Sequence, residues 1–156
     1  MPQTIPYEGT SIPPERTQAE ITGLLYKEGA EATRWTMTKE GRSELEFVFK
    51  IQNRPVAFRI TPPLLMRKRH ERGHRGRTVE MPDAPASMRL MFWWLKAQLE
   101  AIRWGLVSVE EAFLAYVAGS LPGRGTVTLG DLLLPKIRSG ELLGPSDLEK
   151  ALPSGE

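Results

Sequence analysis

The segment with the most specific chemical pattern runs from His70 to His74 and reads HERGH. In the H-E-x-x-H pattern a helix holds two imidazoles one turn apart as zinc ligands, and the glutamate is the general base of a hydrolase. These two histidines are the only ones in the chain. A carboxylate from elsewhere would therefore have to supply a third ligand, and a zinc hydrolase is the first hypothesis to test.

The residues around HERGH argue against a metal site. The segment has no apolar face with which a helix could dock, and Gly73 and Gly76 would each cost about 1 kcal/mol inside a helix. Six nearby cations would also repel a divalent ion. Elsewhere, GSLPGRGT at 119–126 lacks the P-loop spacing, and the sequence offers no base to activate a nucleophile. We therefore expect no enzymatic activity, no metal and no cofactor.

Positive charge is concentrated in a basic arm, Arg67–Arg77, which reads RKRHERGHRGR. It holds six basic residues and one acidic residue, which leaves 15 basic against 18 acidic residues in the rest of the chain. Such concentration is typical of a segment that binds a polyanion, although a solvated loop that only aids solubility would also be basic. We favour phosphate contact by Arg67, Lys68, Arg69, Arg72, Arg75 and Arg77.

The hydrophobic pattern predicts an α+β fold. A helix is expected over 14–28, and alternating apolar residues near 33–37, 45–51 and 56–60 predict a three-stranded antiparallel meander with one buried face. The strongest helical pattern covers 86–104, and this long central helix should pack on the sheet. A capping box, Ser108 with Glu111, and the segment TLGDLLLPKI predict one or two short C-terminal helices.

These elements indicate one domain over 14–138, preceded by an extended leader at 1–13 and followed by a tail at 139–156. Residues 66–85 are expected to form a flexible, irregular basic insertion, because four prolines surround the arm. The chain has no cysteine, no long apolar segment and no secretory leader, which favours the cytoplasm and no membrane association. One asparagine and many arginines favour a thermophilic source.

The central helix is apolar on two sides. One face should cover the sheet and consists of Met88, Met91, Phe92, Leu95, Leu99, Ile102 and Leu106. The second face lies nearly opposite and consists of Leu90, Trp94, Ala97, Ala101 and Trp104. Either other helices or a second subunit must cover it, so these five residues are the candidate interface of a homo-oligomer.

Between these faces lies a cationic strip with one indole: Arg89, Trp93, Lys96 and Arg103. Its spacing suits single-stranded nucleic acid, with cations along the phosphates and the indole stacked on a base. The alternative is a solvated flank in which Lys96 pairs with Glu100. The polar face of the sheet carries three further cations, Arg34, Lys50 and Arg59. They could bind a ligand, or they could form salt bridges with neighbouring glutamates.

Four segments resemble a family of small bacteriophage and prophage proteins. They are SIPPERTQAEITGLLYKEGA (11–30), RPVAFRITPPL (54–64), LKAQLEAIRWGLVSVEEAFLAYV (95–117) and TLGDLLLPKI (128–137). The resemblance implies a phage setting, the cytoplasm of the host, and a basic insertion between the third strand and the main helix. It supplies no catalytic residues. The predicted order of elements is also similar to the core of Rad52-like single-strand annealing proteins.

Together these features favour a phage DNA-metabolism protein that binds single-stranded DNA without sequence preference and promotes annealing or recombination as a homo-oligomer. The alternative is a protein-interaction module, either a virion component or a phage factor that binds a host protein. That module would use the second apolar face and have no role with nucleic acid.

Overall fold

The structure, a computed structural model, describes residues 4–71 and 76–142 of the 156-residue chain. Its elements are α1 (Pro14–Lys27), β1 (Ala32–Met37), β2 (Ser43–Ile51), β3 (Arg54–Ile60), β4 (Met66–His70), β5 (Thr78–Pro82), α2 (Ala84–Arg103), α3 (Val109–Phe113), the 3₁₀ turn η1 (Leu114–Tyr116), β6 (Ala118–Leu121), β7 (Gly125–Thr128) and α4 (Leu129–Arg138). The predicted α+β class is confirmed, with its N-terminal helix, antiparallel meander, long central helix and short C-terminal helices.

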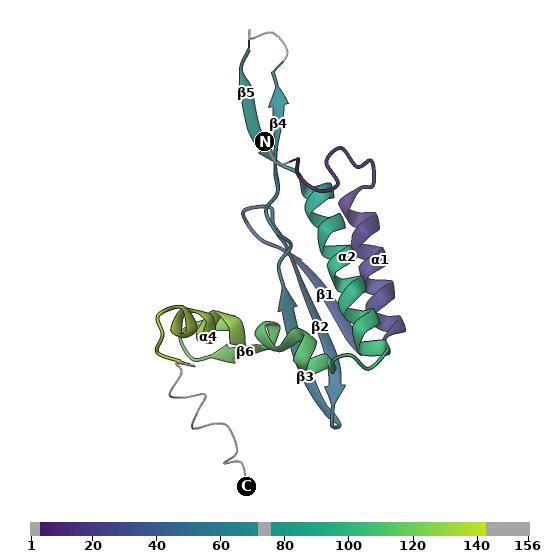
Figure 1. Ribbon diagram of the computed structural model, residues 1–156, viewed down its shortest axis with the longest axis vertical. Coiled ribbons are helices and arrows are strands. Elements are labelled where there is room, and N and C mark those ends of the chain that lie inside the picture. Colours follow the sequence, from purple (N-terminus) through teal and green to yellow (C-terminus); the bar gives the residue numbers. More distant parts are fainter. Residues whose placement is uncertain (1–3, 72–75, 143–156) are drawn as a thin grey trace.

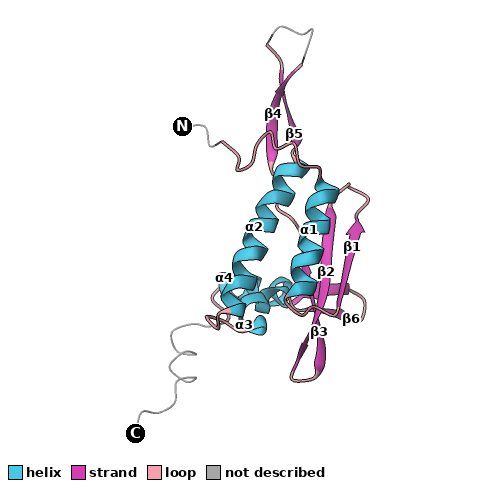
Figure 2. Ribbon diagram, turned by 90° about the vertical axis from the view of Figure 1, so that its right-hand side faces the viewer, coloured by secondary structure: helices cyan, strands magenta, loops and turns pink. Residues whose placement is uncertain are grey.

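The sheet has the order β1-β2-β3, and both neighbours of β2 run antiparallel to it. Gln52 and Asn53, both with positive φ, make a tight two-residue turn between β2 and β3. Helices α1 and α2 lie side by side across one face of this sheet (Figures 1 and 2). The meander predicted from residue alternation is therefore present, with its apolar face under two helices.

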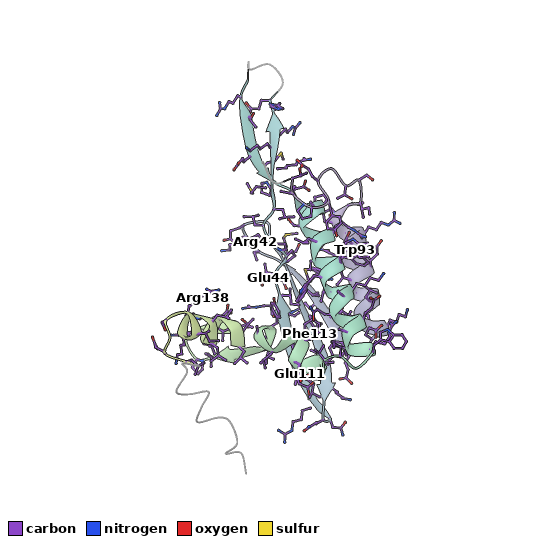
Figure 3. The ribbon with its side chains drawn as sticks, in the orientation of Figure 1. Arg42, Glu44, Trp93, Glu111, Phe113 and Arg138 are labelled. Atoms are coloured by element: carbon purple, nitrogen blue, oxygen red, sulfur yellow. The ribbon has the colours of Figure 1, made fainter. Side chains whose placement is uncertain are left out.

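The core lies between the sheet and the helices, where aromatic side chains from three elements meet. Phe47 and Phe58 come from the sheet, and Phe113 of α3 closes the lower end in Figure 3. The Phe113 ring centroid lies 5.3 Å from that of Phe47 and 5.7 Å from that of Phe58, and all three side chains are fully buried. Aromatic pairs at this spacing each add about 0.5–1.5 kcal/mol beyond the burial of their area.

The first apolar face of α2 packs on the sheet largely as predicted. Met88, Met91, Phe92, Leu95 and Leu99 are buried. The prediction that Leu106 belongs to this buried face is wrong. Helix α2 ends at Arg103 and the chain turns at Gly105, so the Leu106 side chain is 80% exposed. The helical period cannot be continued past that turn.

The polar face of the sheet is held by ion pairs. They are Arg34–Glu46, Lys50–Glu31 with 2.9 Å between Nζ and Oε1, and Arg59–Asp131 with 3.7 Å between Nη2 and Oδ2. Each of the three cations that sequence placed on this face therefore has a carboxylate from the chain itself. The salt-bridge interpretation holds for Arg34 with the partner expected across the strands, whereas Lys50 and Arg59 pair with carboxylates outside the sheet.

Residues 66–85 correct the prediction of an irregular insertion. Strands β4 and β5 form an antiparallel hairpin that projects from one end of the molecule, beyond the helices (Figures 1 and 2). Pro82 does not break it. Hydrogen bonds join Asp83 N to Leu65 O (2.8 Å) and Glu71 N to Arg77 O (3.2 Å), so the alternate pair Met66–Pro82 needs no N–H from Pro82.

The C-terminal part contains a second short hairpin that the sequence did not indicate. Strands β6 and β7 lie in the glycine-rich region around 119–126, and α4 follows directly with Thr128 and Asp131 as a capping box. The predicted capping box at Ser108 and Glu111 is confirmed: Glu111 N donates to Ser108 Oγ at 3.2 Å, and Ser108 N donates to Glu111 Oε2 at 2.7 Å.

Candidate nucleic-acid interface

The basic hairpin, which we define as strands β4 and β5 with Glu71 and Arg77 at their far ends, is fixed to the start of α2 by hydrogen bonds. Leu65 N donates to Ser87 Oγ at 3.2 Å, and the Ser87 hydroxyl donates to the Asp83 carbonyl at 2.9 Å. Asp83 is buried, and its Oδ1 accepts from Ala86 N at 3.0 Å as the N-cap of α2. The hairpin is therefore positioned by the core helix from which it rises.

The register of the hairpin separates its side chains into two faces. The arginine face carries Arg67, Arg69 and Arg77 together with Glu71, Val79 and Met81. The opposite face carries Lys68 across from Glu80 and His70 across from Thr78. Side chains alternate along a strand. The three arginines therefore share one side, while the other side has one cation, one carboxylate and a histidine.

The cations of the basic hairpin form no salt bridge with a carboxylate among the described residues, and the same is true of scattered body cations such as Lys27 and Arg54. In the described part of the chain, Arg16, Arg34, Lys50, Arg59, Arg89 and Arg103 all form salt bridges with carboxylates. None of those bridges involves Arg67, Lys68, Arg69 or Arg77. Lys68, Arg69 and Arg77 are exposed, and Arg67 is half-buried. The positive charge of these four residues is therefore not neutralised by the described carboxylates and is available to an external anion.

Two of the predicted phosphate contacts, Arg72 and Arg75, lie outside the described residues, as do Gly73 and His74. His70 ends strand β4 and lies 3.2 Å from the Thr78 hydroxyl through Nδ1. A strand at this position does not fit the helical H-E-x-x-H geometry. Among residues 4–71 and 76–142, no group of three or more histidine or carboxylate side chains is placed to hold a metal ion.

Arg89 corrects the predicted cationic strip on α2. Its side chain is buried, with Nη1 2.6 Å from Glu20 Oε2 and 3.5 Å from Thr17 Oγ1. The guanidinium also lies over the Phe92 ring, 4.3 Å from its centroid. The prediction failed because α1 packs against this side of α2, which the helical period of α2 alone cannot show. Arg89 is a core residue and cannot reach phosphates.

The rest of the strip is only partly available. Arg103 forms a salt bridge with Glu28, the C-cap residue of α1, so its charge is already neutralised. Trp93 is 43% exposed, and Lys96 Nζ lies 5.1 Å from the centroid of its ring. Figure 3 places Trp93 partway along α2, apart from the basic hairpin. One indole and one cation therefore remain from the four predicted residues.

The second apolar face of α2 is divided between the fold and the surface. Trp94 packs on Phe113 and Tyr116, with ring centroids 6.1 Å and 5.5 Å away. Leu90 and Trp94 line a shallow apolar hollow of about 380 Å³ beside β3. Ala97 is exposed and Ala101 half-buried. Trp104, by contrast, is 82% exposed. The second face is thus covered at Trp94 by α3 and η1, and it is open at Trp104.

Comparison with known proteins gives no match: no family model, no curated protein and no solved structure is similar to this chain. The resemblances to phage proteins and to Rad52-like proteins therefore stay predictions. Within the described ranges, no helix is long and apolar enough to cross a membrane.

Sequence reasoning missed the residues that anchor the basic hairpin. Asp83 followed by Pro85 is a helix-start signal, because aspartate caps and proline suits the first turn. That signal was available and would have moved the start of the helix to Ala84. The contact between Ser87 and Leu65 had no local signal, since it joins segments 22 residues apart.

Proposed function

We propose that this protein binds nucleic acid without sequence preference, through phosphate contacts made by the cations of the basic hairpin. One observation carries the proposal: the hairpin projects from the body (Figure 1) and gathers four described cations, three of them exposed, that have no acidic partner among the described residues. The rest of the chain is net acidic, so attraction to a polyanion should be strongest at this surface, where the cations are concentrated.

The shape of the hairpin supports the proposal as well as its charge. A five-residue strand is about 17 Å long, so Arg69 and Arg77, which lie toward the far end of the hairpin, are carried beyond the helices of the body (Figure 1). At physiological salt, charges separated by more than about 8 Å are largely screened from one another. The acidic residues of the body therefore do little to weaken binding at the hairpin.

The wider role follows from the sequence. We propose a part in phage DNA metabolism, with strand annealing or recombination as the process and the host cytoplasm as the compartment. A preference for single strands was inferred from four residues of α2, of which only Trp93 and Lys96 remain accessible for it.

The test replaces the four described cations of the basic hairpin with glutamine, which keeps the stems of the side chains and removes their charge. The variant R67Q/K68Q/R69Q/R77Q is expected to bind DNA oligonucleotides about 100-fold more weakly at moderate salt, because about four phosphate contacts are lost. Binding is measured by fluorescence anisotropy, and folding is checked by circular dichroism and thermal unfolding.

A matched control removes the same total charge from exposed cations of the body. The variant K27Q/K39Q/R54Q/R124Q takes one cation from each of four places, the end of α1, the β1–β2 turn, the start of β3 and the β6–β7 turn. It should weaken binding only a few-fold, through net charge alone. Equal losses in the two variants, or no binding by the wild-type protein, would overturn the proposal.

A second candidate function has one observation in its favour. Trp104 and Leu106 are 82% and 80% exposed and lie two residues apart after the last turn of α2. Large apolar side chains that share a surface often mark a protein–protein contact. We propose that this surface contacts either a second copy of the chain or another protein. A protein-interaction module therefore stays the alternative to nucleic-acid binding.

A further inference from the structure

We infer that the ligand of the basic hairpin is duplex DNA, and that the arginine face enters the major groove while the opposite face points to solvent. This inference rests on the proposed function and adds the substrate class and the orientation.

The distribution of charge between the two faces is the first reason. Arg67, Arg69 and Arg77 stand on one face with a single carboxylate, Glu71. On the other face, Lys68 is paired in register with Glu80, so the net charge of that face is near zero. A flexible single strand could wrap around either side of a ribbon. A duplex lies against one side only, and a one-sided array of cations matches it.

The dimensions of the hairpin are the second reason. Two strands lie about 4.8 Å apart, and with side chains such a ribbon fits a B-DNA major groove, which is about 12 Å wide and admits a two-stranded ribbon. The major groove of duplex RNA is too narrow and deep for side chains to read. The arginine face therefore fits duplex DNA better than duplex RNA.

The chemistry of the face is the third reason. Arginine forks can donate two hydrogen bonds to guanine or bridge to flanking phosphates, and apolar side chains can contact thymine methyl groups. Val79 and Met81 lie on the same face as the arginines and are half-buried. Phe, Tyr and Trp are absent from residues 66–82. Proteins that bind single strands use such rings as stacking platforms, and the hairpin has none.

The experiment compares two neighbouring single-charge variants, Arg69→Ala and Lys68→Ala. Both side chains are exposed and both belong to β4, but they point to opposite faces. On a DNA duplex, Arg69→Ala should weaken binding about tenfold, because a groove contact is lost. Lys68→Ala should weaken it only about twofold, through the general loss of one charge. The same titrations are run on the separated strand and on an RNA duplex of matching sequence.

The inference also predicts that the wild-type protein prefers the DNA duplex to both other probes. Equal losses from the two variants, or tighter binding to the single strand or to duplex RNA, would overturn it. Such a result could be accompanied by binding that still depends on the hairpin cations. The proposed function would then stand, and only the inference that the arginine face enters the major groove of duplex DNA would fail. If no probe bound through the hairpin, both would fail.

Discussion

Replacing Arg89 with alanine is expected to destabilise the fold while leaving nucleic-acid binding unchanged. Arg89 lies under α1, with Nη1 2.6 Å from the Glu20 carboxylate and its guanidinium over Phe92. A hydrogen bond between charged groups contributes about 1.5–3 kcal/mol, and the cation–π contact about 0.5–1 kcal/mol. Glu20 is 35% exposed and stays hydrated when its partner is removed, so the lower part of this range applies.

We therefore expect a loss of about 2–3 kcal/mol, which for a chain of this size lowers Tm by about 5–10 °C. Thermal unfolding followed by circular dichroism measures the shift. Urea unfolding should show a lower midpoint with the same dependence on denaturant, because the surface exposed on unfolding does not change.

The chain supplies a matched control in Arg16, which pairs with the same carboxylate. Arg16 Nε lies 3.6 Å from Glu20 Oε1, but its side chain is 71% exposed. Exposed pairs one helical turn apart contribute about 0.3–0.5 kcal/mol, so Arg16→Ala should lower Tm by no more than about 2 °C. Equal losses at the two positions would refute the burial argument. So would an Arg89→Ala variant that binds DNA more weakly at an unchanged Tm.

Two further predictions concern the C-terminal half of the chain. The hydrogen bond from Thr128 N, and then the Thr128 side chain, lower the pKa of Asp131 from its ordinary value of 3.8, with a smaller contribution from Arg59. A depressed pKa adds stability that is complete above the ordinary value and is lost as the pH falls through the folded-state value. The difference in stability between wild type and Asp131→Asn should therefore shrink between about pH 5 and pH 2 in chemical unfolding, and a constant difference would disprove this role. If the wild-type protein self-associates, replacing both Trp104 and Leu106 with serine should make it a monomer in sedimentation velocity. The Tm of this variant should stay within about 2 °C of the wild-type value, because both side chains are exposed. Unchanged self-association would exclude this surface as the contact.

Much of the fold was predictable because the buried residues repeat with the period of their own element. Leu45, Phe47 and Phe49 recur at every second position of β2, and Leu95 and Leu99 recur on one side of α2. Such periods are set by local geometry and do not require knowledge of the neighbouring elements. The capping box formed by Ser108 and Glu111 could also be predicted, because it too depends only on local sequence.

The basic hairpin could not be recognised in this way, because β4 has no apolar alternation and only Val79 and Met81 of β5 alternate with polar residues. Its pairing depends on the register that Leu65 and Asp83 establish at its base. Arg89 was misplaced for a different reason. Whether a cation on a helix meets solvent or a carboxylate is decided by the helix packed beside it, and Glu20 lies 69 residues away in sequence. Periodicity within one element carries no information on that contact.

The central claim is that the cations of the basic hairpin hold a polyanion. The most direct measurement is the salt dependence of DNA binding by the wild-type protein and by R67Q/K68Q/R69Q/R77Q, using fluorescence anisotropy on one duplex. Each phosphate contact contributes about −0.9 to the slope of log affinity against log salt concentration, so the loss of three or four contacts should make the slope of the variant shallower by about 3 to 4. Identical slopes for the two proteins would contradict the claim.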